Sequence, residues 1–189
     1  MTRSLRTDPP AMRAARRAGE ACGIHVMQAR AGFVHPAARR DIEELLEFFG
    51  PPATYGLRSV ELRHAVDPGG TCGGIPVARL HVPGRVVLYE QPRPPWVLRG
   101  LSARALERLQ RAGAVLDVAA AATRVQWPDQ TLRDFVLFDG LMHEIGHHLV
   151  QHHRGKRSLR VMRTADHERC AEAFSAACRL AWAGRSGRE

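Results

Sequence analysis

Histidine is concentrated in one segment, "LMHEIGHHLVQHH" at 141–153, which holds five of the chain's ten histidines and a single acid, Glu144. His143 and His147 stand four residues apart, a spacing that places two side chains on one face of a helix, about one turn apart. Two imidazoles arranged in this way can bind one metal ion. Glu144 follows the first histidine and is placed to act as general base toward a water molecule on that metal. The pattern predicts a hydrolytic zinc site.

Catalytic zinc usually takes a third protein ligand, and two residues compete for that place. His153 follows His143 by ten residues, but its use as a ligand requires the chain to turn sharply at Val150. A β-branched residue does not readily adopt the positive φ of such a turn, so Val150 favours a helix that continues past it. The rival is Glu168, in a second predicted helix.

Three polar residues close to Glu168 are further candidates. Glu172 lies four residues later on the same helical face, where it could accept the second ring N–H of a ligand histidine or simply face solvent. Asp166 is either a ligand or an acid that favours the helix N-terminus. His167 is either a surface histidine or a donor to a reaction intermediate.

Cys72, in the glycine-rich segment 67–74, is either a thiol ligand or an ordinary loop residue.

The order of these motifs resembles a known enzyme class. HEIGH at 143–147, followed after about twenty residues by E-x-x-A-E-x-F at 168–174, looks like the gluzincin branch of zinc metallopeptidases. It is similar in style to the cytoplasmic ImmA/IrrE-type peptidases, over residues 135–180. The second motif departs from that family's pattern at Glu172, where aspartate is usual, and at Ser175, where alanine is usual.

The resemblance implies a zincin-like fold, one zinc ion per chain bound by His143, His147 and Glu168, and a protein or peptide substrate. In such a fold an edge strand lines the cleft and binds the substrate in an extended form. The segment "RVVLYEQ" at 85–91 is the expected edge strand, and its Tyr89 is a candidate to stabilise an oxyanion, with a packed aromatic as the alternative.

The elements that must position these residues predict an α+β fold. A strand-rich first part is followed by two helices, so we expect a small mixed or antiparallel sheet packed on the active-site helix, plus a second ligand-bearing helix. The expected helices are 41–50, 102–113, 130–152 and 165–184, and the expected strands are 57–64, a hairpin of 75–82 with 85–91, 114–118 and 123–127.

Length and composition favour one domain. The chain has 189 residues, 44% apolar and 25% charged, which are globular proportions. We expect a basic flexible leader at 1–22, a single domain at 23–184 and a tail at 185–189. No segment approaches the ~18 uninterrupted apolar residues of a membrane span, and no export signal is recognisable, so we expect a cytoplasmic protein with no membrane association.

The net charge of +9 leaves a second function open. With 28 basic residues, of which only Lys156 is lysine, the charge fits either a compositional bias toward arginine or an attraction to nucleic acid. The alternative to a peptidase is therefore a non-catalytic metal-binding regulatory module, associated with nucleic acid or a protein partner.

Overall fold

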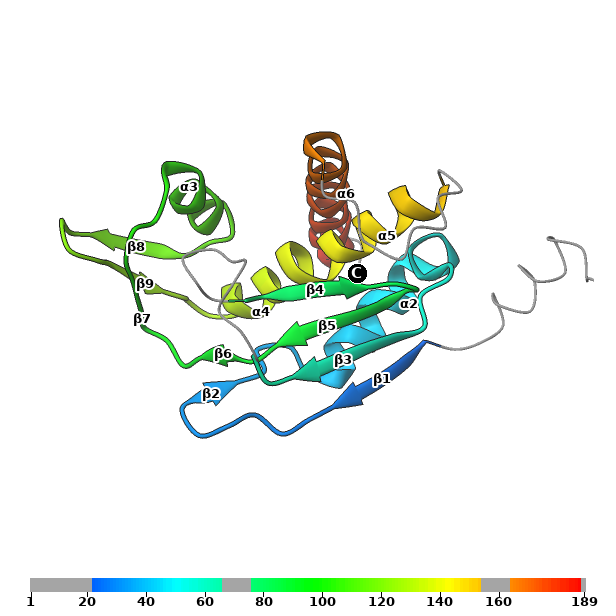
Figure 1. Cartoon of the computed structure of the whole chain (residues 1–189), viewed down its shortest axis with the longest axis horizontal. Coiled ribbons are helices and arrows are strands. Elements are labelled where there is room, and N and C mark those ends of the chain that lie inside the picture. The colour runs from blue at the N-terminus through cyan, green and yellow to red at the C-terminus, as the bar shows by residue number, and fades with distance from the viewer. Residues whose placement is uncertain (1–21, 66–75, 154–163, 188–189) are drawn as a thin grey trace, which may run out of the picture.

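The chain adopts an α+β fold in which helices pack on one face of a four-stranded mixed sheet, as the sequence predicted (Figure 1). The computed structural model describes residues 22–65, 76–153 and 164–187. Outside these ranges lie the expected leader except residue 22, the residue Cys72, and most of the basic segment that joins the last two helices.

The main sheet has the order β1-β3-β5-β4, with β1 (Gly23–Val26), β3 (Ser59–Arg63), β5 (Arg85–Tyr89) and β4 (Ala78–His81). The first three strands are parallel, and β4 pairs antiparallel with β5, which confirms the predicted hairpin. Residues of β5 alternate between two faces. Val86 and Leu88 belong to the core, and Leu88 lies against the helical layer at Gly140.

A second sheet of order β7-β9-β8 is built from β7 (Trp96–Leu98), β9 (Thr123–Gln126) and β8 (Val115–Val118). It carries α3 (Ala103–Arg111), within the expected helix 102–113, and Ser102 is its N-cap because the Ser102 hydroxyl accepts the Ala105 N–H at 3.2 Å. Trp127 joins this sheet to the helical layer, with its ring centroid 5.1 Å from Trp96 and 4.9 Å from Phe135. A short ladder of β2 (Phe33–Val34) and β6 (Gln91–Pro92) completes the strands.

Helix α2 (Arg39–Thr54) is longer than predicted. The expected end at Gly50 is a break within it, because Gly50 has φ 61° and leaves the helical conformation. Pro51 and Pro52 do not stop the helix. They open its second segment instead, where a fixed φ suits proline and the missing N–H would have no intrahelical acceptor.

The predicted helix 130–152 is divided into α4 (Thr131–Phe135), the π-helical segment η1 (Val136–Met142) and α5 (His143–His153). In η1 the His143 N–H reaches back to the Phe138 carbonyl, five residues earlier. Side chains from other elements also donate to carbonyls of this segment: Ser175 Oγ to Phe138 O at 2.6 Å and Arg108 to Asp139 O at 2.8 Å. These donors help to stabilise a hydrogen-bond pattern that proteins use only in short stretches.

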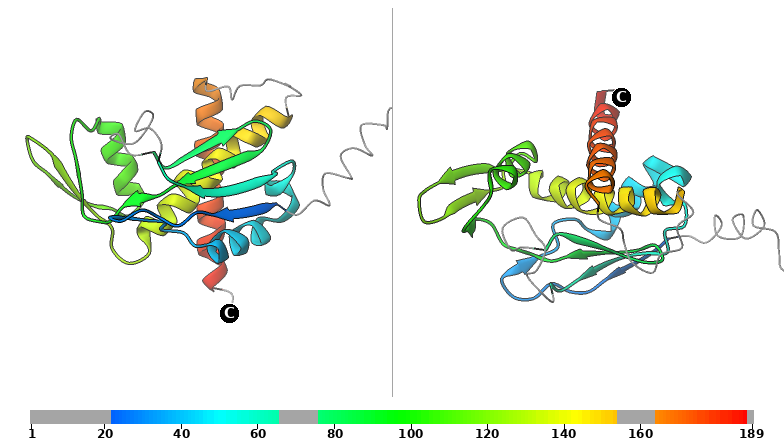
Figure 2. Two further views of the ribbon diagram at one scale, coloured as in Figure 1. Left: turned by 60° about the horizontal axis from the view of Figure 1, so that its bottom comes forward. Right: turned by 45° about the horizontal axis from the view of Figure 1, so that its top comes forward.

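Helix α6 (Ala165–Ala183) crosses over α5, as the views in Figure 2 show, and is followed by η2 (Gly184–Gly187), which extends from the end of the expected domain into the expected tail. Its N-cap is Thr164, whose hydroxyl accepts the His167 N–H at 3.4 Å. None of the helices in the described ranges has the length and apolar character needed to span a membrane.

Candidate metal centre

Three side chains that the sequence proposed as ligands converge on one point. His143 Nε2 and His147 Nε2 lie 3.2 Å apart, and the Glu168 carboxylate lies 3.4 Å from each of them, with one oxygen toward each ring. One ligand atom from each residue can be chosen so that all three lie within 4.8 Å of one another. Neighbouring ligands at about 2.0–2.2 Å from a tetrahedral zinc ion are roughly 3.3–3.6 Å apart. The cluster could therefore hold a metal ion.

The close crossing of α5 and α6 brings Glu168 to the histidines. A Cβ placed on Gly146 would lie 2.9 Å from the Ala171 Cα, so only glycine permits the present approach. A glycine inside a helix costs about 1 kcal/mol relative to alanine, and the close crossing gives a packing reason for that cost. Ala171 is one turn from Glu168, so the contact fixes the position of the Glu168 side chain along α5.

The carboxylate of Glu144 is held by the sheet. Its side chain is 3% exposed, and Oε2 accepts the backbone N–H of Leu80 at 2.9 Å. A hydrogen bond to a charged group of this kind contributes about 1.5–3 kcal/mol. Nearby on β4, burial lowers the pKa of His81, and Arg85 adds to that effect, whereas the charge of Glu144 opposes it.

The edge strand beside the cluster is β4, not the predicted segment 85–91. The strand β5 is paired on both sides, by β3 and β4, and has no open edge. The Tyr89 N–H donates to Val77 O, so the alternation of an antiparallel pair leaves the backbone groups of Ala78 and Leu80 directed away from β5. Periodicity could not reveal this, because both halves of a hairpin show similar alternation.

Tyr89 is not brought to the cluster. It follows Leu88 on β5, so its side chain belongs to the opposite face of the sheet from the one that packs on the helices. This placement favours the alternative of a packed aromatic, and the role of Tyr89 at an oxyanion stays a prediction.

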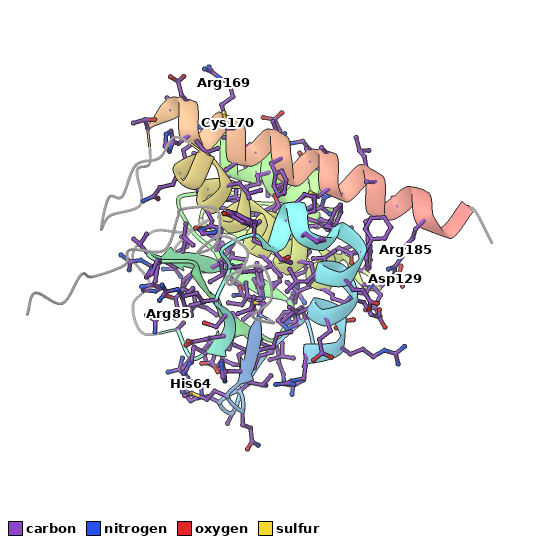
Figure 3. The ribbon with its side chains drawn as sticks, turned by 90° about the vertical axis from the view of Figure 1, so that its right-hand side faces the viewer. His64, Arg85, Asp129, Arg169, Cys170 and Arg185 are labelled. Carbon is purple, nitrogen blue, oxygen red and sulfur yellow. The ribbon has the colours of Figure 1, made fainter. Side chains whose placement is uncertain are left out.

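The other candidates near Glu168 have separate surroundings. Glu172 is half exposed and accepts a hydrogen bond from Arg104 of α3 at 2.5 Å. Asp166 pairs with Arg169 at 2.5 Å on the outward side of α6, where Figure 3 shows Arg169 and Cys170 directed away from the helices beneath. The expectation that His167 is a surface histidine is wrong, because its side chain is 2% exposed.

Helix α5 continues through Val150 to His153, as the valine predicted. The chain therefore makes no sharp turn at this position, and the side chain of His153 lies outside the described part of the structure. His148, which the sequence did not single out, is 6% exposed, and its Nε2 lies 3.0 Å from the Tyr55 carbonyl, so it joins α5 to the end of α2.

A charged cluster next to the ligands escaped the sequence reasoning. Asp139, one turn before His143, contacts Arg108 of α3 at 3.3 Å and is also paired with Arg179 of α6. The guanidinium groups lie over Phe135 and Phe138, at 5.6 and 4.9 Å from the ring centroids. The available signal was an acid in an otherwise apolar helical stretch, which requires a partner when it is partly buried.

Comparison with protein-family models, curated proteins and solved structures gives no match. The assignment of a function rests on the site's own residues.

Proposed function

We propose that the chain is a zinc-dependent peptidase of the gluzincin type, which hydrolyses peptide bonds in a protein substrate. The observation that carries the proposal is the convergence of His143, His147 and Glu168, with Glu144 next to the first ligand on a helix. Two imidazoles and one carboxylate form a donor set that suits zinc, and the three ligands found in the described part of the chain leave a position open for chemistry. A purely structural zinc site would be closed by a fourth protein ligand.

Zinc bound here would polarise the scissile carbonyl and lower the pKa of a water molecule, which is the chemistry that a hydrolase requires of it. Glu144 is the residue that takes the proton from the attacking water and returns it to the leaving amine. Its hydrogen bond from Leu80 fixes the carboxylate beside His143. The role fits a carboxylate held rigidly beside the ligands.

Among the described residues no strand pairs with the outer edge of β4, which supports a peptide as the substrate. The outward-facing backbone groups of Ala78, and the carbonyl of Leu80, are placed to pair with an extended chain, which is how peptides add to a sheet edge. The Leu80 N–H is already bound to Glu144, so a substrate strand would use the remaining groups. The same hydrogen bond therefore holds the Glu144 carboxylate at a defined position relative to the edge strand.

Metal content tests the ligand set first. We expect about one zinc ion per chain in the tag-free protein and a sharp loss in Glu168→Ala. Glu172→Ala is the matched control, one turn along the same helix, and we expect it to retain the metal because its carboxylate pairs with Arg104. Elemental analysis with His153→Ala included decides between the two third ligands. Unchanged zinc in Glu168→Ala, or loss in His153→Ala, would contradict the assignment.

Turnover is tested separately with Glu144→Gln. Loss of a general base typically costs 10²–10⁴ in rate, so we expect this variant to keep zinc and fold but to lose cleavage of a denatured protein or peptide library by at least about a hundredfold. Zinc-loaded wild type that cleaves no better than Glu144→Gln would favour the non-catalytic regulatory module.

A further inference from the structure

A pocket of about 330 Å³ lies beside the ligand His143, between α3 and α6. Its charged lining residues come from three elements and are mostly arginines: Arg108 and Arg111 of α3, Arg179 of α6, with Asp139 of η1 and Glu172 of α6. Ala112, Ala176 and Leu180 also line it. The pocket therefore combines apolar surface with three guanidinium groups.

The charges around this pocket do not balance. Asp139 is shared by Arg108 and Arg179, and Glu172 is paired with Arg104, which approaches from α3. Arg111 is exposed, and in the described residues no ion pair involves it. Three arginines thus line a space with two acids, both of which already have arginine partners, so the region carries net positive charge.

The guanidinium groups of Arg108 and Arg179 are held in place before any ligand arrives. Each is fixed by Asp139 on one side and by the face of a phenylalanine on the other. A guanidinium presents five N–H donors, more than these contacts use. Positioned donors with spare hydrogen-bonding capacity are suited to a planar anion, and arginine binds carboxylate oxygens in pairs.

We propose that this pocket binds the carboxylate of an aspartate or glutamate side chain of the substrate, one or two residues from the bond that is cut. The inference rests on the proposed peptidase function, because it makes the pocket a specificity subsite of the metal centre. His143 belongs to both, as a ligand and as part of the pocket lining, so a side chain in the pocket is attached to backbone close to the metal. The chain prefers acidic substrates for this reason.

Peptide-library cleavage with zinc-loaded protein tests the specificity. The comparison is between wild type, Arg111→Glu and the matched control Arg99→Glu, an exposed arginine in the loop between β7 and α3. We expect wild type to enrich Asp and Glu at one position near the cut. In Arg111→Glu the ratio of kcat/KM between a Glu peptide and its Gln counterpart should fall about tenfold, and in Arg99→Glu it should stay unchanged.

The position of the cut distinguishes the sources of the carboxylate. Internal cuts next to Asp or Glu support the side-chain assignment, whereas release of single C-terminal residues assigns the pocket to the terminal carboxylate and overturns it. Cleavage without acidic preference, or with an equal ratio in the two variants, also overturns the inference while the peptidase proposal stands.

A binding measurement separates the two proposals if no peptide is cut. N-acetyl-glutamate amide and N-acetyl-glutamine amide are titrated into wild type and Arg111→Glu, and binding is followed by NMR of the arginine Nε–H signals. Saturable binding of the glutamate probe alone, lost in Arg111→Glu, keeps the carboxylate pocket although the peptidase proposal fails. Equal binding of both probes, or no binding, overturns the pocket assignment.

Discussion

Replacing Gly146 by alanine should loosen the metal centre without touching a ligand. The added Cβ would lie 2.9 Å from the Ala171 Cα and 3.3 Å from its carbonyl oxygen, and both are backbone atoms that cannot rotate away. Carbon atoms in good contact are about 3.5–4.0 Å apart, so α6 must move away from α5 by roughly 0.6–1 Å. That displacement carries Glu168 away from His143 and His147.

The stability change is the difference of two effects. Overpacking of a tight contact costs about 1–3 kcal/mol, and alanine recovers about 1 kcal/mol of helix propensity, so the net loss is about 0–2 kcal/mol. Zinc affinity should respond more strongly, because metal–ligand distances tolerate only about 0.2 Å. We expect at least about a tenfold loss of affinity in Gly146→Ala.

Zinc competition with a chelator and urea unfolding measure the two quantities side by side. Gly184→Ala is the control, since no atom lies within 4 Å of its added Cβ and its φ is −71°. The reasoning is refuted if Gly146→Ala binds zinc as tightly as this control. Ala171→Gly should not rescue Gly146→Ala fully, because the closest atom is the Cα, which the second substitution keeps.

Two further predictions concern charge and thiols. Burial raises the pKa of the Glu90 carboxyl, but hydrogen bonds and charge from Arg30 outweigh burial, so the pKa in the folded state is lowered. The stability that results is present above the pKa of the unfolded state and is lost as pH falls through the pKa of the folded state. Glu90→Gln should therefore flatten the acid limb of a curve of unfolding free energy against pH. Burial raises the pKa of the Cys22 and Cys178 thiols to about 11, whereas Cys170 is exposed. Iodoacetamide at pH 8 should therefore label Cys170 well before Cys22 and Cys178 in the native protein, as followed by mass spectrometry. Equal labelling rates would contradict this prediction.

Much of the local structure could be predicted from the sequence. The four-residue spacing of His143 and His147 fixed their common face, and Ser102 and Val150 correctly indicated a helix start and a helix that continues. These predictions depend on contacts within one or two helical turns, where residue spacing and backbone conformational preference determine the structure. Glu168 was one of two candidates for the third ligand, and it is the one that lies against both histidines.

The failures concern contacts between distant segments. Alternation in 85–91 could not distinguish an edge strand from an inner one, so Tyr89 was placed at the wrong face. The burial of His167 follows from α6 lying against α5, which no local pattern encodes. Ser175 looked like a neutral departure from a motif, yet its hydroxyl donates to the Phe138 carbonyl in η1.

The π-helical segment η1 sets the direction in which the side chains of the following helix α5 point around the helix axis. A π turn closes hydrogen bonds five residues apart and holds one residue more than an α turn. If η1 had α-helical bonding with the same number of residues, His143 would be rotated by about 100° around the helix axis, away from Glu168. The direction of the HEIGH motif is thus set by a π-helical segment that contributes no ligand.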